Sequence, residues 1–324
     1  MKAAVVSSPG GPEVLDIVER PDPEPREGEV LIRIRAFGLN RAELFTRNGD
    51  SGPAVKFPRV IGIECVGEVV AAPGTAFAAG QRVAAMMGGM GRSFDGSYAE
   101  MTRVPAASVF AVETDLDWAT FGALPEMFQT SQGSLSTGLQ AKAGENLLIR
   151  GGTSSIGLTV ASLAKRQGLS VASTTRNASK RDALEGAGVD HVLVDQGGSL
   201  VDPVHQAFGR GPDTVLDLIG TRTLRDSLLC AAPGGRVCMT GMLGGEWVWD
   251  RFEPFLDIPN GVFLTSYGGS SGDVTAEQLQ AYVDDVAAGR VPVALDRTFA
   301  LDEIVEAHRH MEANKARGKV VVLP

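Results

Sequence analysis

Apolar and polar residues alternate in short runs through the first third of the chain. Val30, Ile32 and Ile34 are separated by single residues that include Arg33, and this period of two is typical of a half-buried β-strand. Turn signals such as Pro73-Gly74 separate the runs. One short helix is predicted over residues 40–47. We therefore predict a compact, mostly β domain over residues 1–119.

The pattern changes after residue 119 to strands that alternate with helices. An apolar run at 147–149 leads into a glycine-rich turn, and the helical pattern that follows places Ile156, Val160 and Leu163 on one face. A second apolar strand at 169–174 completes a βαβ unit. Further strand and helix patterns follow, so we predict a doubly wound, mainly parallel sheet over residues 120–262.

The last part of the chain, residues 263–324, is too short to form a domain of its own. Thr275 and Gln278 form a capping box before a helix that Gly289 ends. A second helix is predicted over residues 302–314 and a strand over 319–323. We expect this segment to return to the first domain and to complete it.

The turn between the first strand and helix of the βαβ unit carries the clearest chemical signal. Glycines without a Cβ let a pyrophosphate approach the backbone, and the N-terminus of the following helix attracts phosphate. A plain strand-to-helix loop is the alternative reading of the turn taken alone. Serine stands where the usual spacing has glycine, and its hydroxyl is expected either to contact phosphate or to loosen the fit. The predicted phosphate-binding residues are Gly151, Gly152, Thr153, Ser154, Ser155 and Ile156.

The residues at the end of the second strand indicate which cofactor binds. NAD sites usually have an acidic residue about 20 positions beyond the glycine turn, but residues 173–180 contain none. Thr175, Arg176 and Lys180 suit the charged 2′-phosphate of NADPH instead. The alternative is a solvated basic helix start, although basic residues there oppose the helix dipole. The loops after later strands, including Gly241, are predicted to edge the cofactor cleft.

Composition excludes several classes of partner. A net charge of −9 and an isoelectric point near 5.1 argue against nucleic acid and anionic membranes as partners. The three cysteines form no C-x-x-C pair, which fits a reducing compartment. Neither a signal peptide nor a run long enough to span a bilayer is recognisable. We therefore expect a cytoplasmic protein.

Over its whole length the chain resembles the zinc-independent quinone oxidoreductase (zeta-crystallin-like) branch of the medium-chain dehydrogenase/reductase superfamily. The stretches that carry the resemblance are residues 10–15, 38–43, 95–100, 151–157 and 318–322. The resemblance implies a GroES-like catalytic domain built from both ends of the chain and a Rossmann domain in the middle. It also implies NADPH in the cleft between them and a homodimer.

The metal ligands of zinc-dependent relatives are replaced in this sequence. Asn40 stands at the position of a cysteine ligand and Ile63 at that of a histidine ligand. Residues 86–100 contain no cysteine, so the four-cysteine lobe of those relatives is also missing. The four histidines, at 191, 205, 308 and 310, have no partners at ligand spacing. No metal site is predicted.

Without a metal, the favoured reaction is hydride transfer from NADPH to a quinone or an α,β-unsaturated carbonyl compound, in which conjugation spreads the incoming charge. By resemblance, Asn40 and Thr130 act near the nicotinamide and Lys319 contacts the cofactor. Each of these residues also has an alternative, purely structural role. Asn40 would be a helix cap, Thr130 a hydroxyl that bonds back to its own helix, and Lys319 a solvated charge at a strand end. Glu43 occupies an aspartate position of the family. Tyr98 is the strongest candidate for a proton donor, but its strand-like segment predicts that it is a core residue.

Two other functions share this sequence pattern. An enoyl-thioester reductase has the same fold and also lacks zinc, but it needs a basic groove for coenzyme A or for carrier-protein phosphate. A crystallin-like protein that binds NADPH with little turnover is the alternative outside enzymology. Turnover with a simple quinone would distinguish either enzyme from the crystallin-like protein.

Overall fold

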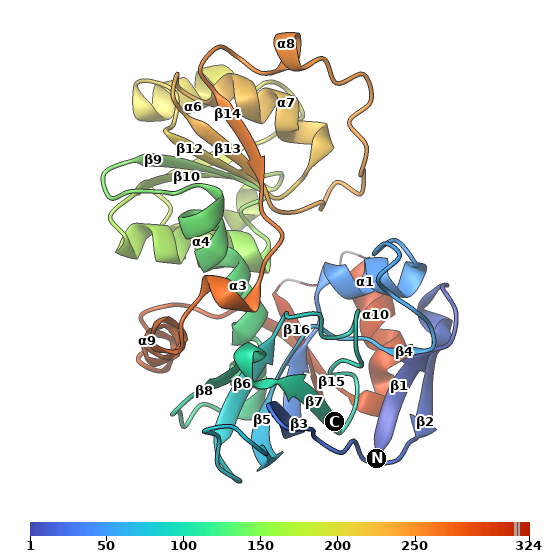
Figure 1. The fold of residues 1–324 in the computed structure, drawn as a ribbon. Helices are drawn as coiled ribbons and strands as arrows, with labels where there is room; N and C mark the ends of the chain where they lie inside the picture. The colour runs from blue at the N-terminus through green and yellow to red at the C-terminus, as the bar shows by residue number, and fades with distance from the viewer. Residues whose placement is uncertain (314–315, 317) are drawn as a thin grey trace. The chain divides into compact units, whose positions relative to one another are not determined.

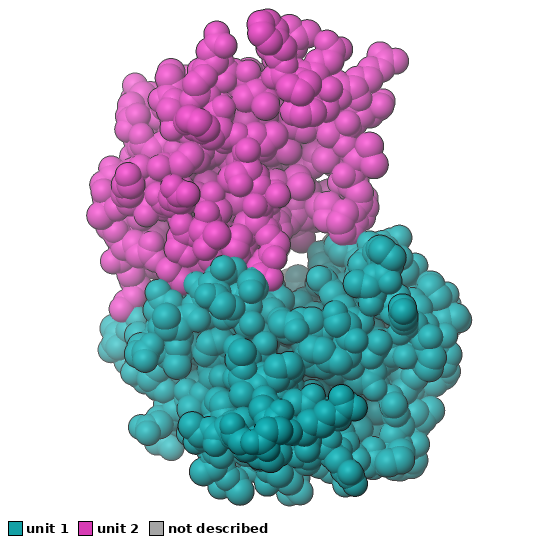
Figure 2. Space-filling view, viewed as in Figure 1, with its two compact units in different colours: residues 1–129, 270–324 teal, residues 130–269 magenta. Residues whose placement is uncertain are grey.

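The computed structural model describes residues 1–313, 316 and 318–324. The chain folds into two compact units, of which unit 1 comprises residues 1–129 and 270–324 and unit 2 residues 130–269 (Figures 1 and 2). The sequence pattern placed these divisions at 119/120 and 262/263. Helix α3 (Leu124–Gly133) runs through the first boundary, so the division lies within a helix rather than at the change of pattern.

Unit 1 is built mainly of β-strands. Its strands are β1 (Lys2–Val6), β2 (Leu15–Glu19), β3 (Glu29–Gly38), β4 (Arg59–Val60), β5 (Glu64–Ala71), β6 (Arg82–Met86), β7 (Met101–Pro105), β8 (Val109–Ala111), β15 (Leu295–Ala300) and β16 (Lys319–Leu323). Its helices are α1 (Arg41–Asn48), α2 (Trp118–Gly122), the first part of α3, α9 (Ala276–Ala287) and α10 (Ile304–Glu312). Short 3-10 helices cover Pro12–Val14, Ala106–Ser108, Ser271–Asp273 and Leu301–Glu303.

The last strand of the chain joins the larger sheet of unit 1, whose other strands come mostly from residues 1–129. Strand order in the larger sheet is β15-β16-β3-β5-β6-β8, with β7 also paired to β3, and a smaller sheet has the order β2-β1-β4. β16 pairs antiparallel with β3, with Val322 opposite Phe37. Along β3, Ile32 and Ile34 are buried while Arg33 is exposed, as the alternating pattern predicted. The C-terminal segment therefore completes the core of unit 1.

One polar cluster in the core of unit 1 surrounds a histidine. His308 on α10 is fully buried, with its Nδ1 2.9 Å from a guanidinium nitrogen of Arg47 and its Nε2 2.9 Å from the hydroxyl of Tyr98. Burial, together with the charge of Arg47, lowers the pKa of His308 to about 3, so the imidazole is neutral at physiological pH. Tyr98 is also fully buried, which confirms that it is a core residue.

Unit 2 has the alternating architecture that the pattern predicted (Figure 1). Its strands are β9 (Asn146–Arg150), β10 (Ser170–Thr175), β11 (His191–Val194), β12 (Thr214–Asp217), β13 (Arg236–Met239) and β14 (Phe263–Ser266). Its helices are the end of α3, a π-helical turn at Ser134–Gly138, α4 (Ser155–Arg166), a 3-10 turn at Ala178–Lys180, α5 (Arg181–Gly186), α6 (Val201–Phe208), α7 (Thr221–Cys230) and α8 (Pro254–Asp257).

All six strands of unit 2 pair in parallel, in the order β11-β10-β9-β12-β13-β14. β9 lies in the middle, where Leu147, Leu148 and Ile149 are fully buried, as expected for a strand covered on both faces. The carboxyl ends of the strands therefore share one edge of the sheet, and the strand order changes direction at β9. Ligands bind at such a point in doubly wound sheets.

The bounds of one C-terminal helix differ from the sequence prediction. The second C-terminal helix starts later than predicted, because Leu301–Glu303 forms a 3-10 turn, in which the Glu303 carboxylate accepts from the backbone N–H of Ala300, before α10 begins at Ile304. The predicted end of this helix, residue 314, lies outside the described residues.

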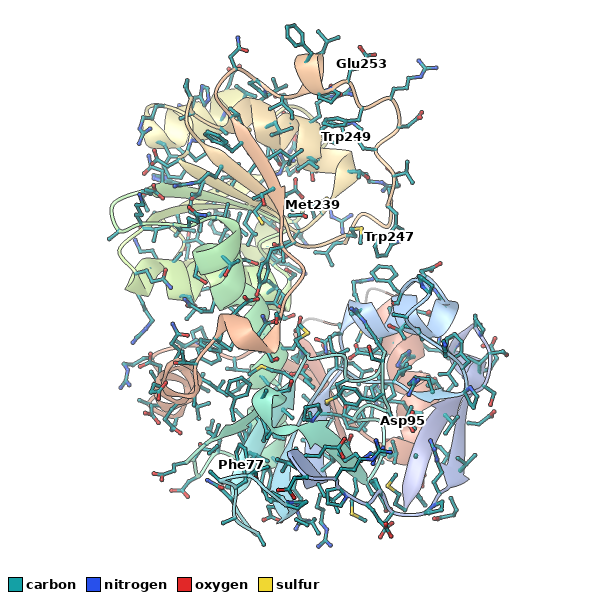
Figure 3. The ribbon with its side chains drawn as sticks, viewed as in Figure 1. Phe77, Asp95, Met239, Trp247, Trp249 and Glu253 are labelled. Carbon is teal, nitrogen blue, oxygen red and sulfur yellow. The ribbon has the colours of Figure 1, made fainter. Side chains whose placement is uncertain are left out.

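The segment between β13 and β14 runs away from the sheet (Figure 1). Several of its apolar side chains are exposed. Val248 is 78% exposed and Phe255 97% exposed. Trp247 and Trp249, labelled in Figure 3, lie on the same segment. None of the described helices combines the length and hydrophobicity that crossing a bilayer requires.

Candidate functional site

The glycine-rich turn of unit 2 is anchored to the neighbouring strand. Gly151 has a φ of +84° and donates its N–H to the Thr174 hydroxyl at 3.0 Å, while Gly152 donates to the Thr174 carbonyl at 3.1 Å. A Cβ on Gly157 would lie 2.6 Å from the carbonyl oxygen of Gly152. The turn and the first turn of α4 are therefore packed against each other through their backbones, which only glycine permits.

Ser154 is the N-cap of α4. Its hydroxyl accepts from the N–H of Gly157 at 3.1 Å and donates to the carbonyl of Gly151 at 2.8 Å. This serine departs from the family spacing, but serine is a preferred N-cap, and that signal was present in the sequence. Its hydroxyl hydrogen is used within the turn.

Three backbone donors remain at the start of α4. Among the described residues, the N–H groups of Thr153, Ser155 and Ile156 have no hydrogen-bond partner. Such unpaired N–H groups, together with the positive end of the helix dipole, form a ready anion-binding site. These three N–H groups lie within residues 151–156, for which the sequence predicts phosphate binding, and a donor set of this kind is suited to an anion such as a pyrophosphate.

The end of β10 presents positive charge to solvent. The buried Thr175 hydroxyl donates to the carbonyl of Asn177 and accepts from its N–H, both at 3.1 Å, so this side chain shapes the loop. Arg176 is exposed and Lys180 half-buried, and within the described part of the chain neither side chain forms an ion pair or hydrogen bond. Both cations are therefore available to an anionic ligand.

The neighbouring strand ends place Gly241 and Thr130 in the same region of unit 2. A Cβ on Gly241 would lie 2.6 Å from the carbonyl oxygen of Leu218, so the loops after β12 and β13 touch at this glycine. Thr130 is buried at the start of unit 2, and its carbonyl accepts from the Ser134 hydroxyl at 2.6 Å. Ser134 also lies 3.1 Å from the hydroxyl of Thr240, at the carboxyl end of β13. Sequence reasoning predicted that the loop at 240–242, which includes Thr240, edges the cofactor cleft, but it did not find Ser134.

Unit 1 contains a second polar cluster, in which Lys319 is surrounded by oxygen atoms. The Lys319 side chain is 2% exposed, and its ammonium lies 2.8 Å from Glu64 Oε1 and 3.1 Å from Glu126 Oε2. It also donates to Oδ1 of Asn40. An ammonium has three N–H donors, and three oxygens surround this one. The three donors of Lys319 are thus occupied within unit 1, whereas the resemblance implies that this lysine contacts the cofactor.

The amide of Asn40 is held from both sides. Its Nδ2 donates to Glu43 at 3.2 Å and to Glu64 at 3.0 Å, while Oδ1 accepts from Lys319. Asn40 stands at the N-cap position of α1, but its side chain makes no capping bond, and Glu43 instead accepts from the Asn40 backbone N–H at 2.6 Å. Both amide N–H groups are used, so Asn40 can offer a ligand only the second lone pair of Oδ1.

Burial shifts the pKa values of this cluster. It raises the pKa of Glu43 to about 7, against the opposing effect of the hydrogen bonds from Asn40 and Ile63, and it also raises the pKa of Glu64. For Lys319, burial favours the neutral form, but the charges of Glu64 and Glu126 outweigh it and raise the pKa. The ammonium therefore stays charged.

Sequence reasoning missed the two glutamates that hold Lys319. Glu64 is a lone acid between Ile63 and Cys65 at the start of an apolar strand, and this position signals a buried charge that needs a partner. Glu126 gave no such signal. Only the pairing of β16 with β3 brings Lys319 to them.

Gly157→Ala should destabilise unit 2 by about 1–3 kcal/mol, because the new methyl group meets backbone atoms of the turn that cannot rotate away. Gly186→Ala is the matched control, since a Cβ at this exposed position in α5 meets no atom within 4 Å. The control should be neutral or stabilising by up to about 1 kcal/mol. Urea unfolding measures both, and equal stabilities would contradict the packing described for the turn.

Glu43→Gln should change how stability depends on pH. Because the native pKa of Glu43 is raised from 4.5 to about 7, the native protein binds this proton more tightly than the unfolded chain. The wild type should therefore lose about 3 kcal/mol relative to the variant as the pH rises from 4.5 to 7. Urea unfolding across this range measures the difference, which should be constant below pH 4.5; parallel curves throughout would sink the assignment.

Two family models match separate parts of the chain. Residues 26–114 match an alcohol dehydrogenase GroES-like domain, and residues 187–322 match a zinc-binding dehydrogenase. By the resemblance described in the sequence analysis, Asn40 and Ile63 stand where zinc-dependent relatives have metal ligands.

Relatives and solved structures extend the match to the full length. The chain is 26% identical over 329 residues to the quinone oxidoreductase of Lama guanicoe, covering 100% of this chain and 97% of the relative. It is 28% identical over 334 residues to a 2-haloacrylate reductase of a Burkholderia species, covering 99% and 98%. A mycobacterial protein solved in complex with NADPH superposes with a TM-score of 0.87 at 28% identity, with full coverage of both chains. The chain is thus an oxidoreductase of the medium-chain dehydrogenase/reductase superfamily and belongs to its quinone oxidoreductase branch.

Proposed function

We propose that this protein is an NADPH-dependent reductase that transfers a hydride to a quinone or an α,β-unsaturated carbonyl compound. The observation that carries the proposal is the set of unpaired N–H groups at the start of α4, with the unpaired cations Arg176 and Lys180 at the end of β10. The printed names of the relatives support the same reaction class: quinone oxidoreductase and 2-haloacrylate reductase. The NADPH complex of the mycobacterial protein supports the cofactor.

In this proposal unit 2 binds the dinucleotide. Within residues 151–156, the unpaired N–H groups of Thr153, Ser155 and Ile156 hold the pyrophosphate, and Arg176 and Lys180 pair with the 2′-phosphate. Thr175 shapes the loop that carries Arg176, and Gly241 edges the cofactor cleft where the loops after β12 and β13 touch. When bound, NADPH supplies the hydride. Positioning and charge complementarity are what the chain contributes.

Asn40 and Thr130 are proposed, by resemblance, to act near the nicotinamide. Because both N–H groups of the Asn40 amide are occupied, it can accept a hydrogen bond from a hydroxyl or an amide of the cofactor but cannot donate one to a developing oxyanion. A conjugated acceptor needs less of such donation, because conjugation spreads the incoming negative charge. Tyr98 is enclosed in the core with His308, so we assign the proton to solvent.

Two alternatives make different demands. An enoyl-thioester reductase needs a further basic groove for the phosphates of its substrate, whereas the proposal commits Arg176 and Lys180 to the cofactor. A crystallin-like protein would bind NADPH without useful turnover. The homodimer and the cytoplasmic location stay predictions.

Fluorescence titration with NADPH and NADH, followed by assays with 1,4-benzoquinone and a simple enone, tests the function. We expect tighter binding of NADPH and turnover of at least one acceptor. A preference for NADH would overturn the 2′-phosphate assignment. NADPH binding without any turnover would favour the crystallin-like reading.

Arg176→Ala should weaken NADPH binding by about tenfold or more and leave NADH binding unchanged, since a charged hydrogen bond to the 2′-phosphate contributes about 1.5–3 kcal/mol. Arg181→Ala is the matched control, because Arg181 is five residues further on and pairs with Glu185 at 3.5 Å. Its dissociation constants for both cofactors should match the wild type. Equal losses for NADPH and NADH in Arg176→Ala would show that this residue does not read the 2′-phosphate.

A further inference from the structure

The cluster around Asn40 has a charge arrangement that selects one orientation of its amide. Lys319 lies on the Oδ1 side, and Glu43 and Glu64 lie on the Nδ2 side. A flipped amide would place N–H groups against the ammonium and an oxygen against two carboxyl groups. In a buried site such contacts are costly because little water screens them. The ammonium therefore fixes which atom of Asn40 is presented.

Packing holds Lys319 where this effect is possible. The residue begins β16, and Glu64 and Glu126 come from β5 and α3. On β3, a Cβ at Gly38 would lie 2.5 Å from Cε of Lys319, so a glycine at this position makes room for the lysine. Asn40 follows only two residues later. The same short segment thus admits the lysine and places the amide that it contacts.

We propose that Lys319 is a positioning residue, which influences the nicotinamide end of the cofactor only by orienting Asn40. Its three N–H donors are taken by Asn40, Glu64 and Glu126, and its side chain is 2% exposed. The inference rests on the proposed function for its kinetic consequence, but the orientation of Asn40 can be measured without cofactor. It replaces the direct cofactor contact that the family resemblance implies for this lysine.

The first test uses the cofactor-free protein. The side-chain amide signals of Asn40 are assigned in a nitrogen–proton correlation spectrum by their loss in Asn40→Ala. In Lys319→Met these signals should shift and exchange faster with solvent, and in Lys319→Arg, which keeps the charge, they should remain near their wild-type positions. Lys2→Met is the matched control, because Lys2 forms an exposed ion pair with Asp302 at 2.9 Å. Unchanged Asn40 signals in Lys319→Met would overturn the proposal, even if the proposed function fails.

The second test is a double-mutant cycle with NADPH and 1,4-benzoquinone. Lys319→Met and Asn40→Ala should each lower kcat by a similar factor, of about tenfold, and the double variant should be no slower than Asn40→Ala alone. Lys319→Arg should recover most of the rate. Losses that multiply in the double variant would show that Lys319 acts independently of Asn40, as a direct contact would.

A folding defect is separated from positioning by a second pair of variants. If Lys319→Met does not fold, the double variant Lys319→Met/Glu64→Gln replaces it in the cycle, because it removes a carboxylate together with the ammonium. The rate of this double variant is then compared with that of Glu64→Gln alone. A merely structural lysine would lower the yield of folded protein but not kcat per folded molecule, and that result also overturns the proposal. A wild type that binds no NADPH would instead refute the proposed function.

Discussion

Burying the ammonium of Lys319 is the constraint on which unit 1 depends most. A charge taken out of water has to be matched by opposite charges and hydrogen bonds, and removing one partner of a buried pair commonly costs about 3–5 kcal/mol. Here the partners come from β5 and α3, while the lysine comes from the last strand of the chain. The cluster can form only when β16 has paired with β3. The same contacts that complete the core therefore also set the Asn40 amide.

The candidate binding groups of the two units are positioned by different parts of the chain. In unit 2 the proposed anion site consists of backbone N–H groups at the start of α4, so its geometry follows from the turn and from glycines that allow close packing. The hydroxyl of Ser154 stabilises that turn from within as a helix cap. In unit 1 the arrangement depends on side chains, because Asn40 is held by a lysine and two glutamates.

The electrostatics of unit 1 also bear on the chemistry of its family. The family model that spans positions 40 and 63 is that of an alcohol dehydrogenase GroES-like domain, and in this chain the two positions hold an amide and an apolar side chain. The positive charge next to Asn40 is that of Lys319, and carboxyl groups on its other sides compensate it. A charge so fully compensated is suited to holding an amide in place rather than to polarising a substrate. This agrees with a reaction on conjugated acceptors, for which positioning is the main requirement.

The sequence by itself determined the local elements and the backbone chemistry. The alternation along β3, the βαβ pattern around Gly151 and the capping box at Thr275 depend on residues a few positions apart, and each appears in the structure. The positions of Arg176 and Lys180 at the end of β10 follow from the same pattern. Tertiary structure alone decided the environment of Lys319 and of His308, because their partners are far away in the chain: Lys319 meets Glu64 and Glu126, and His308 meets Arg47 and Tyr98. It also added distant partners to Asn40, whose local partner is Glu43. A single sequence records that such charges exist, but only the packing of the strands determines which of them meet and lose their water.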